Sequence, residues 1–114
     1  MDPNNATIEE VIEVLKRLDD EHLQISDYYK TIDFLFYHNI TQYDAKRAIR
    51  SLTTSDLFKG PVDDDNPKRN YPVWIFKKHI FNCMCYIKLK IINKGKVAVV
   101  ISFHEDENSL LGGA

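Results

Sequence analysis

Three side chains with the chemistry needed to cut RNA lie near the C-terminal end of the sequence. Tyr86 and Lys88 alternate along one apolar stretch, and His104 ends the next one. Of these residue types only the imidazole has an ordinary pKa near 7, so it can take or give a proton at neutral pH. A phenol and an ammonium group can stabilise charge on a phosphate. The set suits metal-independent cleavage, in which one group removes the ribose 2′-hydroxyl proton and another protonates the leaving 5′-oxygen.

The three groups meet only if the two stretches pair as neighbouring strands. Turn residues at 93–96 predict a hairpin between them. Because side chains alternate across a pleat, Tyr86, Lys88 and Lys90 share one face of the first strand. Pairing through the turn brings Tyr86 and Lys88 near His104 or the residue before it.

A simpler interpretation fits the same residues. Lysines on a sheet face keep it solvated and protect its edges from aggregation, and a histidine at a strand end often has no chemical role. Lys59 is equally ordinary when taken alone. From composition alone, a solvated sheet face is the commoner outcome, since clustered titratable groups are often structural.

Aromatic residues and cations lie together in the preceding stretch, where Trp74 and Phe76 are followed by Lys77 and Lys78. Proteins that bind single-stranded RNA stack its bases on aromatic rings and hold its phosphates with cations. The alternative is that Trp74 packs in the core, as most large aromatic residues in strands do.

No metal site or other cofactor site is expected. The aspartates at 63–65 lack the spaced oxygen ligands and the turn glycine of a calcium loop. Cys83 and Cys85 are the only cysteines, and no second pair completes a zinc site. We expect both to be reduced packing residues.

Length and composition favour one soluble domain over residues 1–114. The chain has 114 residues, of which 44% are hydrophobic and 28% charged, enough for a single core. No apolar run approaches the roughly 20 residues of a membrane helix, and the first residues lack the features of a signal peptide. We therefore expect a cytoplasmic protein without membrane contact.

The net charge of −2 conceals a strong asymmetry along the chain. Residues 1–30 have eight acidic and three basic residues, and residues 31–67 have six and four. Residues 68–104 have eight basic residues and no acidic one, before three acidic residues at 105–107. Such a basic stretch is typical of a surface that meets a polyanion, and an acidic segment of a partner protein would also fit it.

Hydrophobic periodicity predicts an α+β fold, with N-terminal helices packed on a curved antiparallel sheet. Helices are expected at about 7–21, 28–40 and 41–52, an edge strand at 22–26, and strands at 71–80, 84–92 and 97–103. The first helix begins with a capping box at Thr7 and Glu10.

The same patterns divide the domain into four parts. The parts are a helical part at about 7–60, a loop at about 61–70, a β-meander at about 71–104 and a flexible tail at 105–114. Within the helical part, residues 57–59 are expected to form a short turn that ends at Gly60 and Pro61.

Four segments resemble, in order and spacing, the motility quorum-sensing regulator (MqsR) family of toxins. They are 51–60 (SLTTSDLFKG), 73–74 (VW), 86–91 (YIKLKI) and 100–104 (VISFH). The resemblance as a whole covers roughly residues 41–105. The resemblance implies a RelE-like fold and a toxin of a type II toxin–antitoxin pair that cleaves single-stranded mRNA without a metal. It also implies a cognate antitoxin as partner; the oligomeric state, monomer or homodimer, stays open.

The resemblance assigns Lys59, Tyr86 and His104 to the active site, with His104 where the best-known members have lysine. The family's catalytic glutamine is replaced by Ile75, which can neither transfer a proton nor bind a phosphate. We therefore expect Lys78 to supply the missing polar group beside Lys59, with Lys77 as the alternative.

The roles expected from the sequence are as follows. Lys59 and Lys78 bind or neutralise the phosphate, while Tyr86 and His104 share orientation and proton transfer. The residues expected to guide RNA across the sheet are Trp74, Phe76, Lys77, Lys88 and Lys90.

Two other functions are open at this point. A catalytically inactive RNA-binding or protein-interaction module would keep the fold and the basic sheet, and Ile75 favours it. An antitoxin or immunity protein would explain the acidic first 30 residues.

Overall fold

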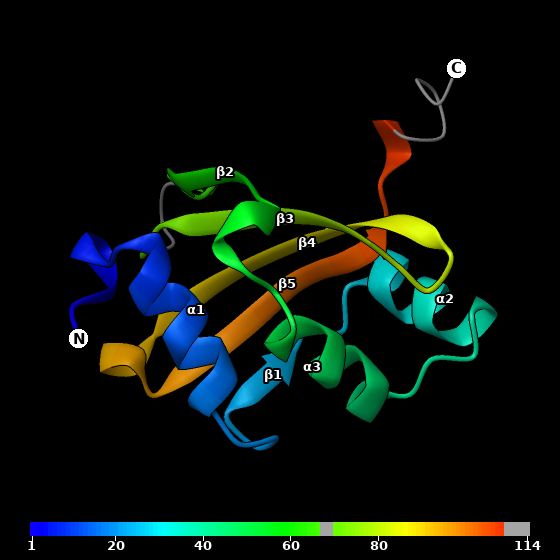
Figure 1. Ribbon diagram of the computed structural model, residues 1–114, viewed down its shortest axis with the longest axis horizontal. Coiled ribbons are helices and arrows are strands. Elements are labelled where there is room, and N and C mark those ends of the chain that lie inside the picture. Colours follow the sequence, from blue (N-terminus) through cyan, green and yellow to red (C-terminus); the bar gives the residue numbers. More distant parts are fainter. Residues whose placement is uncertain (67–69, 109–114) are drawn as a thin grey trace.

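Three α-helices and a five-stranded mixed sheet make up the fold in the computed structural model, which describes residues 1–66 and 70–108 (Figure 1). The helices are α1 (Ile8–Arg17), α2 (Tyr29–Tyr37) and α3 (Gln42–Arg50). The strands are β1 (Leu23–Ile25), β2 (Leu57–Val62), β3 (Val73–Ile80), β4 (Cys83–Ile92) and β5 (Val97–Glu105). Short 3₁₀ turns lie at Pro3–Asn5, Thr54–Asp56 and Asn93–Gly95. The predicted α+β class is confirmed.

The predicted helices are present but shorter than expected. In α1, Thr7 Oγ1 accepts a hydrogen bond from the Glu10 amide, and Glu10 Oε1 accepts one from the Thr7 amide, which is the predicted capping box. α3 begins with the same motif. α1 ends at Arg17 because Leu18 has extended backbone angles, with φ −69° and ψ 139°.

The strand order is β1-β5-β4-β3-β2. β1 runs parallel to β5, and the other neighbours are antiparallel, so the predicted meander and the predicted edge strand are both confirmed. β4 and β5 pair with Tyr86 opposite His104, which is one of the two registers expected.

The predicted division of the chain is wrong at two places. Residues 57–59 belong to strand β2 rather than to a turn, so the helical part contains two strands. A Cβ on Gly60 would lie only 3.1 Å from the Cα of Trp74, so glycine, at φ +146°, lets β2 cross close to β3. The expected tail begins too early, because Glu105 ends β5 and Asp106 is buried; residues 109–114 lie outside the described residues.

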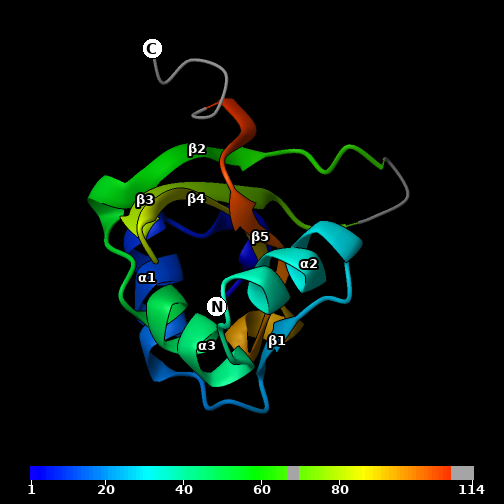
Figure 2. The ribbon, with the colours of Figure 1, turned by 90° about the vertical axis from the view of Figure 1, so that its right-hand side faces the viewer.

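The core lies between the helices and one face of the curved sheet, with α1 and α3 beneath it (Figure 2). The largest buried side chains include Trp74, Phe76, Ile87 and Phe103 from the strands and Leu15 from α1. The opposite face of the sheet, which we call the open face, carries the candidate site. Over residues 1–66 and 70–108, no helix is long and apolar enough to cross a membrane.

Candidate functional site

Two neighbouring rows of side chains cross the open face, because paired residues of adjacent strands point to the same side. The first row runs through Lys59 of β2, Ile75 of β3, Lys88 of β4 and Ser102 of β5. The second row runs through Lys77 of β3, Tyr86 of β4 and His104 of β5. Most of the residues singled out from the sequence are therefore brought together here.

Tyr86 and His104 form the centre of the site. Their rings are stacked, with centroids 5.3 Å apart and planes 15° from parallel. The Tyr28 ring approaches His104 from the N-terminal end of α2, with centroids 6.3 Å apart. All three rings line a hollow of about 320 Å³, which we call the reaction hollow, and Lys88 and Ser102 line it too.

A hydrogen bond to the backbone sets the tautomer of His104. Its Nδ1 lies 2.8 Å from the carbonyl oxygen of Glu105. A carbonyl oxygen can only accept, so Nδ1 carries the hydrogen, and in the neutral ring Nε2 keeps its lone pair. Nε2 is thus the atom that can accept a proton from a substrate.

Tyr86 is held in its neutral form. Burial raises the pKa of the Tyr86 phenol above its ordinary value of 10.0, and the negative charges of Asp65 and Asp106 raise this pKa further. At neutral pH the phenol therefore acts as a hydrogen-bond or proton donor and not as a base.

Each lysine on this part of the open face has an aspartate beside it. The ion pairs are Lys77 with Asp106 at 3.1 Å, Lys88 with Asp65 at 3.5 Å and Lys90 with Asp64 at 2.6 Å. Three of the eight basic residues at 68–104 are therefore paired with aspartates of the acidic segments on either side of this stretch. Two of the aspartates at 63–65, for which no metal role was expected, serve this purpose.

The three pairs differ in how far a ligand can reach the cation. Lys90 is buried, and its partner Asp64 is 5% exposed. The Asp65 side chain is 95% exposed, so water already screens its attraction for Lys88. Lys88, which lines the reaction hollow, is thus a cation that a phosphate can attract with little loss of its existing ion pair.

Lys59 and Ile75 occupy the outer part of the first row. Lys59 is exposed on β2, and Ile75 lies between it and Lys88 in the strand register. An apolar side chain thus separates the two cations in the position where the resemblance implies a glutamine.

Three predicted site residues are not part of this site. Trp74 is 2% exposed and Phe76 is fully buried, both on the helix-facing side of β3, so neither can stack on a base. Lys78 also lies on that side, because it is adjacent to Lys77 in a pleated strand. Its Nζ donates to the Ser51 carbonyl oxygen at 2.9 Å and lies 3.6 Å from Asp56. It cannot share a phosphate with Lys59.

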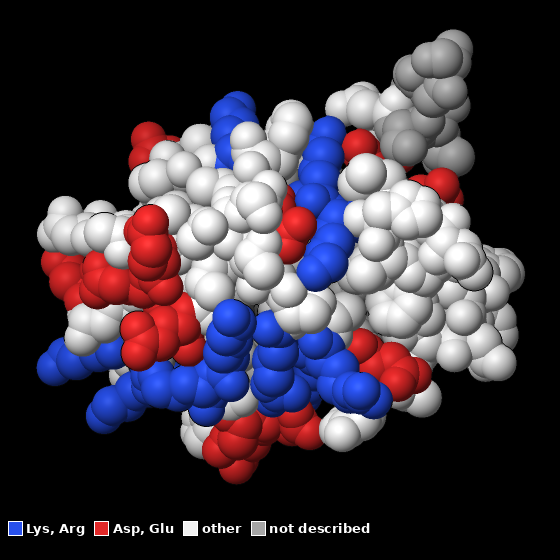
Figure 3. Space-filling view, viewed as in Figure 1, with Lys and Arg blue, Asp and Glu red and all other residues white. Residues whose placement is uncertain are grey.

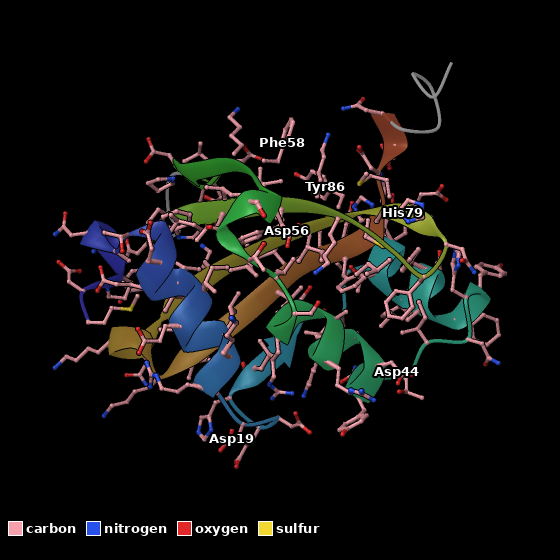
Figure 4. The ribbon with its side chains drawn as sticks, in the orientation of Figure 1. Asp19, Asp44, Asp56, Phe58, His79 and Tyr86 are labelled. Carbon is pink, nitrogen blue, oxygen red and sulfur yellow. The ribbon has the colours of Figure 1, made fainter. Side chains whose placement is uncertain are left out.

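Phe58 is an aromatic candidate that the sequence did not indicate. It is 58% exposed, and the Lys77 Nζ lies 3.8 Å from its ring centroid. Figure 4 shows Phe58 and Tyr86 on the same side of the sheet, away from Asp44 and Asp19. The residue was hidden because the segment 57–59 was expected to be a turn.

A second hollow, of about 600 Å³, adjoins the reaction hollow. The two share Tyr28, Lys88 and Ser102 as lining residues. Its remaining lining is partly apolar, including Val99 and Ile101 of β5. Tyr28 stands between the hollows, a position that no sequence motif indicated.

Cationic residues also gather on the helical side of the molecule. Figure 3 shows Lys and Arg in a band over the end of α1 and over α3. Arg50 of α3 pairs with Asp20 at 2.7 Å, and Lys46 donates to the Asp20 carbonyl oxygen. This band supplies control residues for tests of the open face.

The cysteines behave as expected from the sequence. Cys83 and Cys85 are buried and unoxidised, with their sulfur atoms 3.7 Å apart, and burial raises the pKa of both thiols. Among the residues that the structure describes, no group of three or more His, Cys, Asp or Glu side chains is arranged to hold a metal ion.

Comparison with known proteins identifies no relative of this chain. No protein-family model, no curated protein and no solved structure matches this chain. Membership of the MqsR family and a RelE-like fold therefore stay predictions from the sequence motifs.

Proposed function

We propose that this protein is a metal-independent endoribonuclease that cleaves single-stranded mRNA as the toxin of a type II toxin–antitoxin pair. The observation that carries the nuclease is the stacked pair of Tyr86 and His104 in the reaction hollow, with Lys88 beside it. One group can accept a proton, one can donate a proton, and one is a cation for the phosphate. The toxin role comes from the motif resemblance, and a toxin that cleaves mRNA acts in the cytoplasm.

The geometry suits the following reaction. His104 Nε2 removes the proton of a ribose 2′-hydroxyl, whose oxygen attacks the adjacent phosphorus while Lys88 stabilises the negative charge that develops. The bond from phosphorus to the 5′-oxygen breaks, and the Tyr86 phenol gives that oxygen a proton. The products are a 2′,3′-cyclic phosphate and a 5′-hydroxyl. Transfer of the His104 proton to the phenolate, through water, restores both groups.

The surroundings of the reaction hollow offer places for the rest of the RNA. The second hollow shares Tyr28 and Lys88 with it, and its apolar lining at Val99 and Ile101 suits a nucleobase. On the other side, Phe58 offers an exposed ring beside a cation, as in proteins that bind single strands by stacking.

Cleavage in EDTA tests the proposal. A long single-stranded RNA is incubated with the wild type and with the His104→Ala and Tyr86→Phe variants, and the ends of the products are mapped. We expect site-selective cuts with 2′,3′-cyclic phosphate ends, reduced about 100-fold or more in each variant. His22→Ala is the matched control, because His22 pairs with Asp19 far from the open face.

An inactive RNA-binding module is the second candidate. It is favoured by Ile75 between the two cations and by the aspartates that neutralise the lysines. This protein would bind the RNA, leave it intact, and lose affinity in Lys88→Ala but not in Lys46→Ala. Intact RNA that does not bind would contradict both functions.

The toxin role needs a test in cells. Expression of the wild type is expected to arrest growth, and His104→Ala is expected to be harmless at equal protein level. If the wild-type protein cleaves RNA in vitro but does not arrest growth, the nuclease proposal stands and the toxin role is contradicted.

A further inference from the structure

Helix α2 carries large aromatic and aliphatic residues on its solvent side as well as on its core side. Thr31, Phe34 and Leu35 face the core and are buried. The opposite side exposes Tyr29 by 63%, Ile32 by 51%, Phe36 by 78% and Tyr37 by 79%. A surface helix normally carries mostly charged and polar residues there. In α2 these are limited to Lys30 and Asp33, so its large exposed aromatic and aliphatic side chains are expected to be covered.

The exposed residues form one surface, which we call the α2 face. Tyr29, Ile32 and Phe36 follow one another at spacings of three and four, which places them along one side of the helix. In Figure 3 the end of the molecule over α2 is nearly free of charge, and Figure 2 shows this end toward the viewer. The aromatic and aliphatic residues of the α2 face line neither hollow, whereas Lys30, on the flank of the helix, lines the reaction hollow.

The size of the α2 face matches a small protein interface. An aromatic side chain has about 150–250 Å² of surface, so the exposed fractions amount to about 500 Å². Two such faces bury about 1,000 Å² in total, the lower limit for a specific interface, and patches of this size on monomers are usually functional.

We infer that the α2 face is a homodimer interface, in which α2 packs antiparallel against α2 of a second copy. This inference is independent of the RNA chemistry proposed above. A two-fold axis near Ile32 places Tyr29 of each copy against Phe36 of the other, because these residues lie at similar distances on either side of it. In this arrangement the aromatic rings of Tyr29 and Phe36 contact each other across the interface, and the two Ile32 side chains contact each other at the axis.

The two charged residues of the α2 face fit the same arrangement. Lys30 and Asp33 lie on one flank of the helix, one turn apart. In an antiparallel two-fold pair, that flank meets the same flank of the second copy with its direction reversed. Lys30 of each copy then lies opposite Asp33 of the other, so both charges gain a partner. Lys30 is paired within its own chain to the exposed Glu107, which water can replace.

Sedimentation velocity over a range of concentrations tests the inference. We expect reversible dimers of the 13.3 kDa chain with a dissociation constant in the micromolar range. Phe36→Glu should weaken dimerisation at least about tenfold, because it buries an unpaired charge. Phe58→Glu is the matched control, since Phe58 is similarly exposed but lies on β2; circular dichroism checks that both variants fold.

A charge exchange tests the antiparallel register. Asp33→Lys alone should weaken the dimer, because it sets lysine against lysine, and adding Lys30→Asp should restore it. Monomers at every concentration, or dimers that Phe36→Glu leaves unchanged, would overturn the inference. A dimer sensitive to Phe36→Glu without rescue by the double variant would overturn the antiparallel pairing. None of these readouts depends on RNA cleavage, so failure of the nuclease proposal is seen separately.

Discussion

Lys90 and Asp64 form an ion pair of 2.6 Å whose side chains are only 10% and 5% exposed. Lys90 Nζ also donates to the Asn70 carbonyl oxygen at 3.1 Å, which holds the segment before β3 against the open face. Two residues earlier on the same face of β4, Lys88 pairs with an aspartate that is 95% exposed. One strand face thus presents a structural lysine and an accessible one.

Lys90→Met should destabilise the protein by about 3 kcal/mol, because it removes a buried cation 2.6 Å from the buried Asp64 carboxylate. Lys88→Met is the matched control and should change the free energy of unfolding by less than about 1 kcal/mol, since its partner is solvated. Urea unfolding measures both. Equal effects of the two variants would show that the burial difference has no energetic consequence.

Asp65→Asn should strengthen binding of single-stranded RNA about two- to threefold at low salt, because it removes the carboxylate that competes for Lys88. Asp63→Asn is the control for net charge, since it removes one negative charge from the same exposed segment. Fluorescence anisotropy with a labelled oligonucleotide in EDTA, using the His104→Ala background, measures the affinities. Equal gains in RNA affinity in both variants would show that the effect comes from the change in net charge and not from the Lys88–Asp65 pair.

Alkaline pH should destabilise the protein through Tyr86. The pKa of this phenol is raised in the folded state above its ordinary value of 10.0, so the folded protein binds the proton more tightly than the unfolded chain. The resulting stability is fully present below pH 10 and is lost as pH rises toward the folded-state pKa. In Tyr86→Phe, urea unfolding between pH 8 and about 11 should show a smaller loss; an unchanged slope would contradict the burial of the phenol.

Phe58 and Trp74 should separate RNA binding from stability. Phe58→Ala should weaken RNA binding about tenfold with little change in unfolding, because an exposed stacking ring is lost. Trp74→Phe should lower the free energy of unfolding by about 2 kcal/mol, because the core loses volume, and leave RNA affinity unchanged. Loss of RNA affinity in Trp74→Phe, with unchanged affinity in Phe58→Ala, would instead support Trp74 as the ring on which bases stack.

Local patterns were sufficient for most of the elements and for the pairing of the two strands that carry Tyr86 and His104. The capping box of α1 depends on residues three apart, and the β4–β5 hairpin depends on a short turn, so both could be predicted from neighbouring residues. Strand alternation then placed Tyr86 on the face of Lys88, with either His104 or the residue before it as its neighbour on the next strand. The same alternation, applied to β3, would have removed Lys78 from that face.

Contacts between distant segments could not be predicted in this way. Strand β2 forms because it pairs with β3 across a polar loop, and its segment has no alternation of its own that marks it as a strand. Tyr28 reaches His104 only because α2 packs on β5.

From the sequence alone, the α+β class, the meander and the shared face of Tyr86 and Lys88 could be predicted, since each depends on periodicity and short turns. The register that sets Tyr86 opposite His104 was decided by the folded sheet. The tertiary structure decided which charges remain available. Asp64, Asp65 and Asp106 come from outside the basic stretch, and only folding brings them within 4 Å of Lys90, Lys88 and Lys77. Charge counted along a chain cannot show this, because electrostatic energy depends on distance in space.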